Sequence, residues 1–228
     1  MGFRGGVLYN RLKGENTPYS TITAAPTLPH PLTEQENILL ILIDDITKPQ
    51  PTLFGTWLLI KTETPPKLIF LPIYPSTDNI NTKLDENLNQ SFSLNKSNFP
   101  NQQYWNELIA HKYWWNNYIL LDIEALSTII DSIGGITYEK KRLSGDDLLS
   151  LLTAKSDKSE FSMDGQYFIT KAICNQMQKH EEKNPVDSIF KQSSKGIITD
   201  FNPNELTKRW NNIIQGQSQF SCEFPSFP

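Results

Sequence analysis

The run from Asn37 to Asp45 constrains the fold more than any other feature, because its continuous apolar stretch stops on two adjacent carboxylates. The run is too short to span a membrane and is typical of a strand buried on both faces of a sheet. In α/β sheets, the end of such a strand often lies at the mouth of a ligand-binding cleft. Asp44 and Asp45 are therefore our first candidate site, against the simpler interpretation that they only turn the chain.

The composition restricts the class of protein. A chain of 228 residues fits one domain, and a net charge of −4 without a large basic block argues against nucleic-acid binding. No apolar stretch approaches the roughly 18 residues of a membrane-spanning helix, and Met1 to Gly14 lacks the apolar core of a signal peptide. We infer either a cytoplasmic protein or one whose membrane anchor is missing from this sequence.

The chain divides into three segments. Four prolines among small polar residues between Thr17 and Glu36 are typical of an extended linker, so we assign residues 1–36 to a linker or tether. The folded domain is expected over residues 37–215. Residues 216–228 form a C-terminal tail rich in proline and aromatic residues.

The patterns of apolar residues in the domain predict strands interspersed with helices, which is a layered α/β or α+β arrangement. A helix ending at Gly134 and Gly135 is expected from the spacing of Leu126, Ile130 and Ile133. We predict a long surface loop from Asp78 to Asn101. The other expected strands are Thr56 to Thr62, Lys67 to Pro72, Tyr118 to Asp122 and Ile136 to Lys141; the other expected helices are Tyr104 to His111, Gly145 to Ala154, Met163 to His180 and Pro203 to Gln215.

The sequence contains two cysteines, Cys174 in an expected helix and Cys222 in the tail. Their spacing fits no metal-binding motif. In an oxidising compartment a disulfide between them would pin the tail to the body of the domain. Two unpaired thiols are an equally good interpretation of the sequence.

Several stretches, taken in order, resemble the LytR-CpsA-Psr family. Asn37 to Asp45, the strand at Trp57 and Lys67 to Pro75 resemble the opening of the family domain. The segment from Tyr118 to Ile136 resembles a family strand followed by an Asp-x-hydrophobic-Gly-Gly-Val turn. Leu143 to Ala154 is similar to a family helix, and Gly196 to Leu206 to a late helix start. The resemblance covers roughly Asn37 to Ile214.

This resemblance implies a mixed central β-sheet flanked by helices in an α-β-α arrangement, enclosing an apolar pocket for a polyprenyl tail. Family enzymes transfer a phosphorylated glycopolymer from a polyprenyl pyrophosphate carrier to peptidoglycan. Arginines clamp the pyrophosphate, and Mg²⁺ held by aspartates neutralises the developing charge. The implied location is extracytoplasmic, in the cell envelope, with an N-terminal membrane helix that this chain lacks. The expected partners are a polyprenyl-linked glycopolymer or lipid, or another envelope protein.

The charged motifs of the family are largely missing from this sequence. The family's Arg-Ser-Asp-Thr motif is matched only by Phe54, Gly55 and Thr56, so its Arg and Asp are lost. The Ile-Pro-Arg-Asp motif appears as Leu71-Pro72-Ile73-Tyr74. Since losing one charge-stabilising group commonly costs about 10² to 10³ in rate, a site that lacks several would retain little activity.

Some positions could still contact a ligand. Asp44 and Asp45 match the acid that ends the family's first strand, which makes them the candidate catalytic and metal-binding residues, although two carboxylates alone would bind Mg²⁺ weakly. The candidate ligand-binding residues are Thr56, Thr153 at a family arginine position, Lys155, Lys158 and Gln166.

Three hypotheses follow. In the favoured one, the chain is a degenerate, non-catalytic family member that binds an isoprenoid, a glycopolymer or a partner protein through an apolar cleft. In the second, it is an active phosphotransferase, with Lys155, Lys158 and a second chain supplying the missing charge. In the third, it is a structural or interaction module without a ligand cavity, whose core beside Asp44 is filled.

Overall fold

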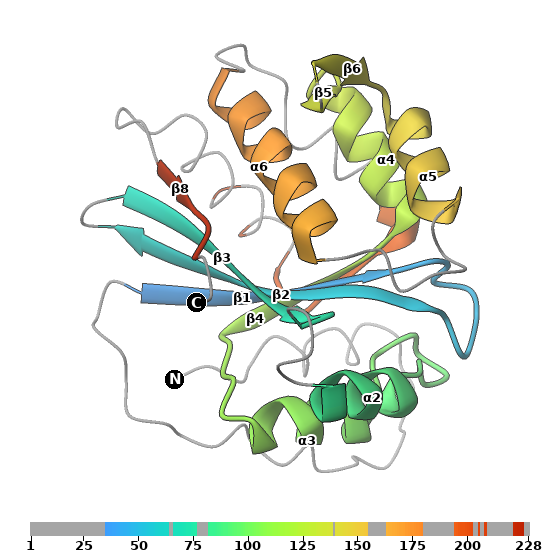
Figure 1. Cartoon of the computed structure of the whole chain (residues 1–228). Coiled ribbons are helices and arrows are strands. Elements are labelled where there is room, and N and C mark those ends of the chain that lie inside the picture. Colours follow the sequence, from blue (N-terminus) through green and yellow to red (C-terminus); the bar gives the residue numbers. More distant parts are fainter. Residues whose placement is uncertain are drawn as a thin grey trace.

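The computed structural model describes residues 35–63, 66–76, 82–138, 140–154, 163–179, 194–202, 205, 208 and 221–225. Its centre is a mixed six-stranded sheet in the order β7-β4-β1-β2-β3-β8. Helices cover both faces: α2 and α3 lie on one side, and α4, α5 and α6 on the other (Figure 1). The α/β class with a mixed sheet between helical layers is therefore confirmed.

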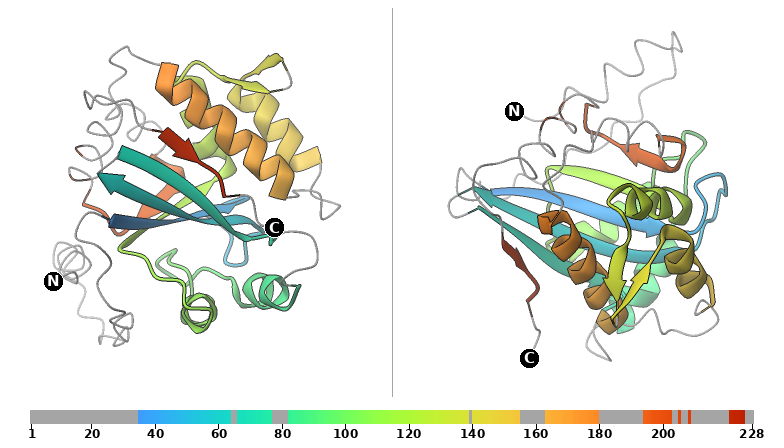
Figure 2. Two further views of the ribbon diagram at one scale, coloured as in Figure 1. Left: turned by 60° about the vertical axis from the view of Figure 1, so that its left-hand side comes forward. Right: turned by 90° about the horizontal axis from the view of Figure 1, so that it is seen from above.

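The sheet is built outward from β1 (Gln35–Ile43), whose leucines and isoleucines are mostly buried because helices cover both faces. It pairs antiparallel with β2 (Leu53–Glu63) and parallel with β4 (Asn117–Asp122). Beyond β2 comes antiparallel β3 (Pro66–Tyr74), and β7 (Ile197–Thr199) pairs antiparallel with β4. The tail contributes β8 (Ser221–Glu223), parallel to β3. Figure 2 shows this order from two further directions.

The helices on the first face are α2 (Thr82–Ser91) and α3 (Gln102–Ala110). The predicted loop from Asp78 to Asn101 is therefore wrong over α2. The polar composition of this segment hid the fact that Leu84, Leu88 and Phe92 recur every four residues, and all three side chains are buried. Burial of this apolar stripe against the sheet outweighs the weak helix propensity of the surrounding asparagines.

The second face carries α4 (Ile123–Ser132), α5 (Gly145–Ala154) and α6 (Met163–Lys179). The expected strand from Ile136 to Lys141 is instead a hairpin of β5 (Ile136–Tyr138) and β6 (Lys141–Leu143), because Lys140 has a positive φ of 65° and reverses the chain. A short 3-10 helix, η1 (Ser194–Gly196), precedes β7.

Other expectations fall partly or wholly outside the described residues. The predicted linker, residues 1–36, lies outside the described residues except for its last two residues, which begin β1. Of the helix expected from Pro203 to Gln215, the structure describes Glu205 and Lys208, both helical. No helix in the described part of the chain combines the length and apolar character needed to cross a bilayer.

Candidate functional site

The carboxyl ends of the two parallel strands bring three acids together. Ile43 of β1 is in register with Asp122 of β4, so Asp44 and Asp45 follow β1 beside Asp122. Asp122 also caps α4, because its Oδ1 accepts a hydrogen bond from the backbone N–H of Ala125 at 2.8 Å. Asp122 was not among the predicted site residues, although the apolar run from Tyr118 that ends in this acid was a usable signal.

The carboxylates of Asp44 and Asp45 bind groups of their own loop. Oδ1 of Asp44 accepts hydrogen bonds from the backbone N–H groups of Asp45 and Thr52, each at 2.8 Å. Its Oδ2 pairs with the ammonium of Lys48 at 2.9 Å. Oδ1 of Asp45 accepts from the backbone N–H and the hydroxyl of Thr47 at 2.8 and 2.7 Å. Both acids therefore stabilise the β1–β2 connection, as expected for Asp in a turn.

Two of the acids have shifted ionisation. The hydrogen bonds from Thr47, with a smaller contribution from Lys48, lower the pKa of Asp45. Burial raises the pKa of Asp122, and the negative charges of Glu124 and Asp45 add to this shift, while hydrogen bonds from backbone N–H groups oppose it. Asp45 is therefore stabilised in its ionised form, whereas burial disfavours the ionised form of Asp122.

The acids at this edge do not fit a resident Mg²⁺ in this arrangement. Internal donors already engage Oδ1 of both Asp44 and Asp45, and a lysine ammonium occupies the other oxygen of Asp44. Among the described residues, no three His, Cys, Asp or Glu side chains are placed to hold one metal ion. Mg²⁺ binding by Asp44 and Asp45 stays a prediction.

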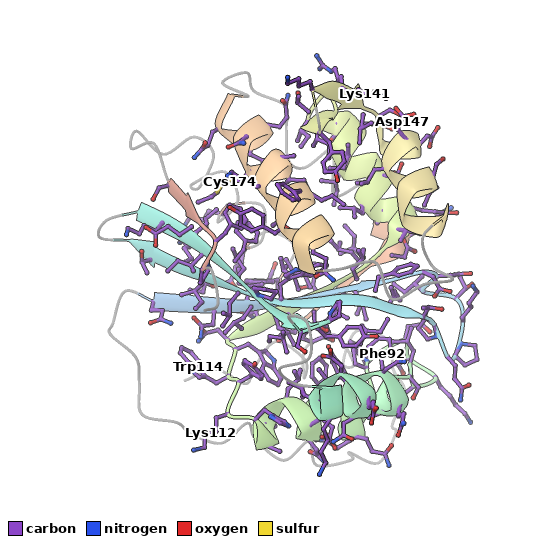
Figure 3. The ribbon with its side chains drawn as sticks, viewed as in Figure 1. Phe92, Lys112, Trp114, Lys141, Asp147 and Cys174 are labelled. Carbon is purple, nitrogen blue, oxygen red and sulfur yellow. A yellow bond between two sulfur atoms is a disulfide. The ribbon has the colours of Figure 1, made fainter. Side chains whose placement is uncertain are left out.

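Thr56 lies in the interior, not at an open surface. Its hydroxyl hydrogen-bonds that of Tyr104 of α3 at 2.8 Å, and both residues are fully buried. Burial strongly raises the pKa of Tyr104, although the bond to Thr56 opposes the shift. Phe92, labelled in Figure 3, packs edge-on against Tyr104 with ring centroids 4.9 Å apart. In this packing the hydroxyl of Thr56 is a structural partner of α3.

Side chains of the protein fill the region of the missing family motifs. Gly55 precedes Thr56 as the motif's Asp precedes its Thr, and a Cβ atom at Gly55 would overlap the indole of Trp57. Ile73, which stands at the second motif's Arg position, is 2% exposed and belongs to the core beneath α2 and α3. Thr56 and Tyr74 are paired across β2 and β3, so the two motif regions are neighbours in space.

The remaining candidates do not assemble into one site among the described residues. Thr153 lies in α5, but its side chain is outside the part that the structure describes, as are Lys155 and Lys158. Gln166 is on the buried side of α6, 1% exposed. Arg142 donates a hydrogen bond to the carbonyl of Gly134, which follows the C-terminal end of α4. That end of the helix is about 15 Å from the N-terminal end, which Asp122 caps.

A groove of about 380 Å³ lies between α2 and α3, and all of its lining residues are of polar types. None of the predicted site residues contributes to it, and it lacks the apolar character expected of a polyprenyl pocket. Its lining residues are Asn87, Gln90, Ser91, Gln103, Asn106 and Glu107.

Cys174 and Cys222 form a disulfide, with their Cα atoms 6.5 Å apart. The sequence left open either a disulfide or two unpaired thiols, and the structure contains the disulfide. The bond joins α6 to β8, so it fixes the tail to the body of the domain.

Solved structures share this fold. TagV of Bacillus subtilis aligns with 86% of this chain and 85% of its own, at 15% identity and a TM-score of 0.55. A LytR-Csp2A-Psr enzyme from Actinomyces oris aligns with 85% of this chain and 82% of its own, at 14% identity and a TM-score of 0.55. A structure described as TagT bound to LI-WTA aligns with 85% of this chain and 78% of its own, at 11% identity and a TM-score of 0.54.

At the level of sequence, no protein-family model and no curated protein matches the chain. The structural likeness, at identities of 11 to 15%, therefore establishes a LytR-CpsA-Psr-like fold and leaves the function to be argued from the residues.

Proposed function

We propose that this chain is a LytR-CpsA-Psr-like domain of the cell envelope that lacks phosphotransfer activity and binds an isoprenoid, a glycopolymer or a partner protein. The fold likeness supports the class. The observation that carries the non-catalytic assignment is the apolar residue at the second motif's Arg position: Ile73 is buried in the core beneath α2 and α3. At the first motif, the half-buried indole of Trp57 occupies the space into which a side chain at position 55 would extend.

A pyrophosphate clamp requires cationic donors in fixed positions, and arginine supplies two parallel N–H donors that an apolar side chain cannot replace. At this edge the ammonium of Lys48 is already paired with Asp44. The carboxylates of Asp44, Asp45 and Asp122 would repel a dianionic phosphate. The edge therefore lacks the charge needed to stabilise phosphoryl transfer.

The proposed location is extracytoplasmic, in the cell envelope. The Cys174–Cys222 disulfide supports this location, because such bonds persist in oxidising compartments. In this proposal the polyprenyl carrier or its glycopolymer reaches the domain from the membrane.

One observation favours the third hypothesis, a structural or interaction module. The side chains beside Asp44 are tightly packed: Ile43, Ile46 and Leu53 are 0, 6 and 3% exposed. Packing of this kind leaves no apolar opening at these three residues.

The activity test is transfer of a polyprenyl-pyrophosphate-linked glycopolymer to peptidoglycan by the purified chain, with the Actinomyces oris enzyme as the positive control. We expect no product from this chain above the no-enzyme background. Mg²⁺-dependent turnover would refute the non-catalytic assignment and favour the second hypothesis.

The binding test is native mass spectrometry with a polyprenyl phosphate and a polyprenyl pyrophosphate, each with and without Mg²⁺. Binding that Asp44→Ala/Asp45→Ala leaves intact would support an apolar site without a metal. Binding that requires both Mg²⁺ and these aspartates would restore the metal site. If neither lipid binds under any condition, the third hypothesis replaces the ligand-binding one.

A further inference from the structure

The last described residues of the chain, 221–225, lie along the edge of β3, and we call them the tail segment. Ser221, Cys222 and Glu223 pair in parallel with Lys67, Leu68 and Ile69. Figures 1 and 2 show β8 beside β3 and next to α6. The tail segment therefore lies between β3 and α6, and we call the position that it fills the β3–α6 groove.

Three side chains of the tail segment, those of Cys222, Glu223 and Phe224, contact β3 or α6. The Phe224 ring stacks on Phe70 of β3 at 5.2 Å between centroids and meets Tyr167 of α6 edge-on at 5.2 Å. The carboxylate of Glu223 pairs with Lys67. The groove thus matches an extended strand that carries an acidic residue followed by an aromatic one.

The non-covalent hold on the tail segment is modest. The paired strand is three residues long, and the Lys67–Glu223 pair is solvent-accessible, with side chains 34 and 46% exposed. The Cys174–Cys222 bond adds a covalent link across 48 residues, which in the chain-entropy model favours the folded over the unfolded chain by a factor on the order of 10³. The disulfide thus adds to the short strand pairing and the exposed ion pair that hold the tail segment beside β3.

We propose that the β3–α6 groove is a binding site for an extended peptide strand of acid-then-aromatic sequence, and that the chain's own tail fills it as a disulfide-latched ligand. A dithiol reductant opens the latch: it transfers two electrons and two protons to the Cys174–Cys222 bond, leaving two thiols, and itself becomes a disulfide. A partner strand then pairs with β3 in place of the tail, as in other cases of strand addition to a sheet edge. This proposal does not depend on the proposed function.

The binding experiment uses the whole chain and a fluorescent peptide that copies residues 219–228 with serine in place of the cysteine. Fluorescence anisotropy should show no binding to the oxidised protein. Binding should appear with Cys222→Ser and tighten about tenfold or more when Phe224→Ala is added, because the second change weakens the competing tail. A control peptide with serine in place of both the acid and the first aromatic residue should bind at least about tenfold more weakly.

Phe70→Ala in the Cys222→Ser background should abolish peptide binding, while Tyr113→Phe, on the other face of the sheet, serves as the matched control. Equal binding by the oxidised wild-type protein would overturn the proposal. So would the absence of binding to both unlatched variants when circular dichroism shows that they are folded.

Hydrogen exchange on the wild-type protein provides a second readout that needs no variant. With dithiothreitol, those amides of Lys67 to Ile69 that face β8 should exchange faster, while those of β4 keep their protection. Unchanged exchange along β3 would show that the disulfide does not hold the tail there. An equal acceleration in β4 would show that the bond holds the whole fold together, and would refute a local latch.

Discussion

The buried Thr56–Tyr104 hydroxyl pair offers a direct test of whether Thr56 binds a ligand or holds the fold together. Both residues are 0% exposed and their oxygens are 2.8 Å apart. Thr56→Val or Tyr104→Phe would leave the other hydroxyl buried without this partner, at a cost of about 1–3 kcal/mol in the free energy of unfolding. The double variant removes both polar groups while keeping their shapes, so we expect it to lie within about 1 kcal/mol of the wild type.

Urea denaturation gives the free energy of unfolding of the wild type, the two single variants and the double variant. Tryptophan fluorescence can follow unfolding, because the chain has five tryptophans. The expected coupling energy in this double-mutant cycle is about 1–3 kcal/mol. Its sign should be such that the double variant loses less stability than the two single variants lose together. Because burial raises the pKa of Tyr104, its hydroxyl stays protonated at neutral pH and no titration disturbs the cycle.

Two results would refute this reasoning. Additive effects of the single substitutions would mean that the two hydroxyls do not depend on each other. A Thr56→Val variant of unchanged stability that loses binding of a polyprenyl phosphate would return Thr56 to the role of a ligand-binding residue.

Three further predictions follow from the packing and charge of the domain. Gly55→Ala should lower the free energy of unfolding by about 1 kcal/mol, because the new methyl overlaps the end of the half-buried Trp57 ring and forces it to move, and chemical denaturation showing no loss would refute this account. Leu88→Ala should cost about 2–5 kcal/mol in the same assay, whereas the exposed control Asn89→Ala should stay within about 0.5 kcal/mol of wild type. Burial raises the pKa of Asp122 above 3.8, so this acid contributes stability at low pH that is lost as the pH rises through its folded-state pKa. Relative to wild type, Asp122→Asn should therefore gain stability between about pH 3 and pH 7, and a constant difference across that range would contradict the shift.

The strands and helices on the α4 side were predictable because their sequences have clear periodicity. Ile130 and Ile133 mark the buried side of α4, and the Gly-Gly pair ends it, as the sequence indicated. The α2 helix was missed because its apolar side is only two leucines wide and its other residues are polar. The prediction of a loop gave more weight to the length and polar composition of this segment than to the weak four-residue period of its leucines.

The candidate site was less predictable than the fold. The sequence placed Asp44 and Asp45 at the end of β1, but it could not show that local N–H groups and Lys48 engage their carboxylates. The bond from Thr56 to Tyr104 spans 48 residues and depends on how α3 packs on the sheet. Contacts of this range are set by tertiary packing, which no local pattern of residues encodes.

The two outermost strands, β7 and β8, are three residues long, whereas the four strands between them have six to eleven. A short outer strand presents few N–H and C=O groups to another chain, so the sheet resists pairing edge to edge with its copies. Loss of β8 would leave nine-residue β3 as the border of the sheet. Purified protein stored with a thiol reductant should therefore aggregate sooner than protein stored without one, and light scattering over days would measure the difference.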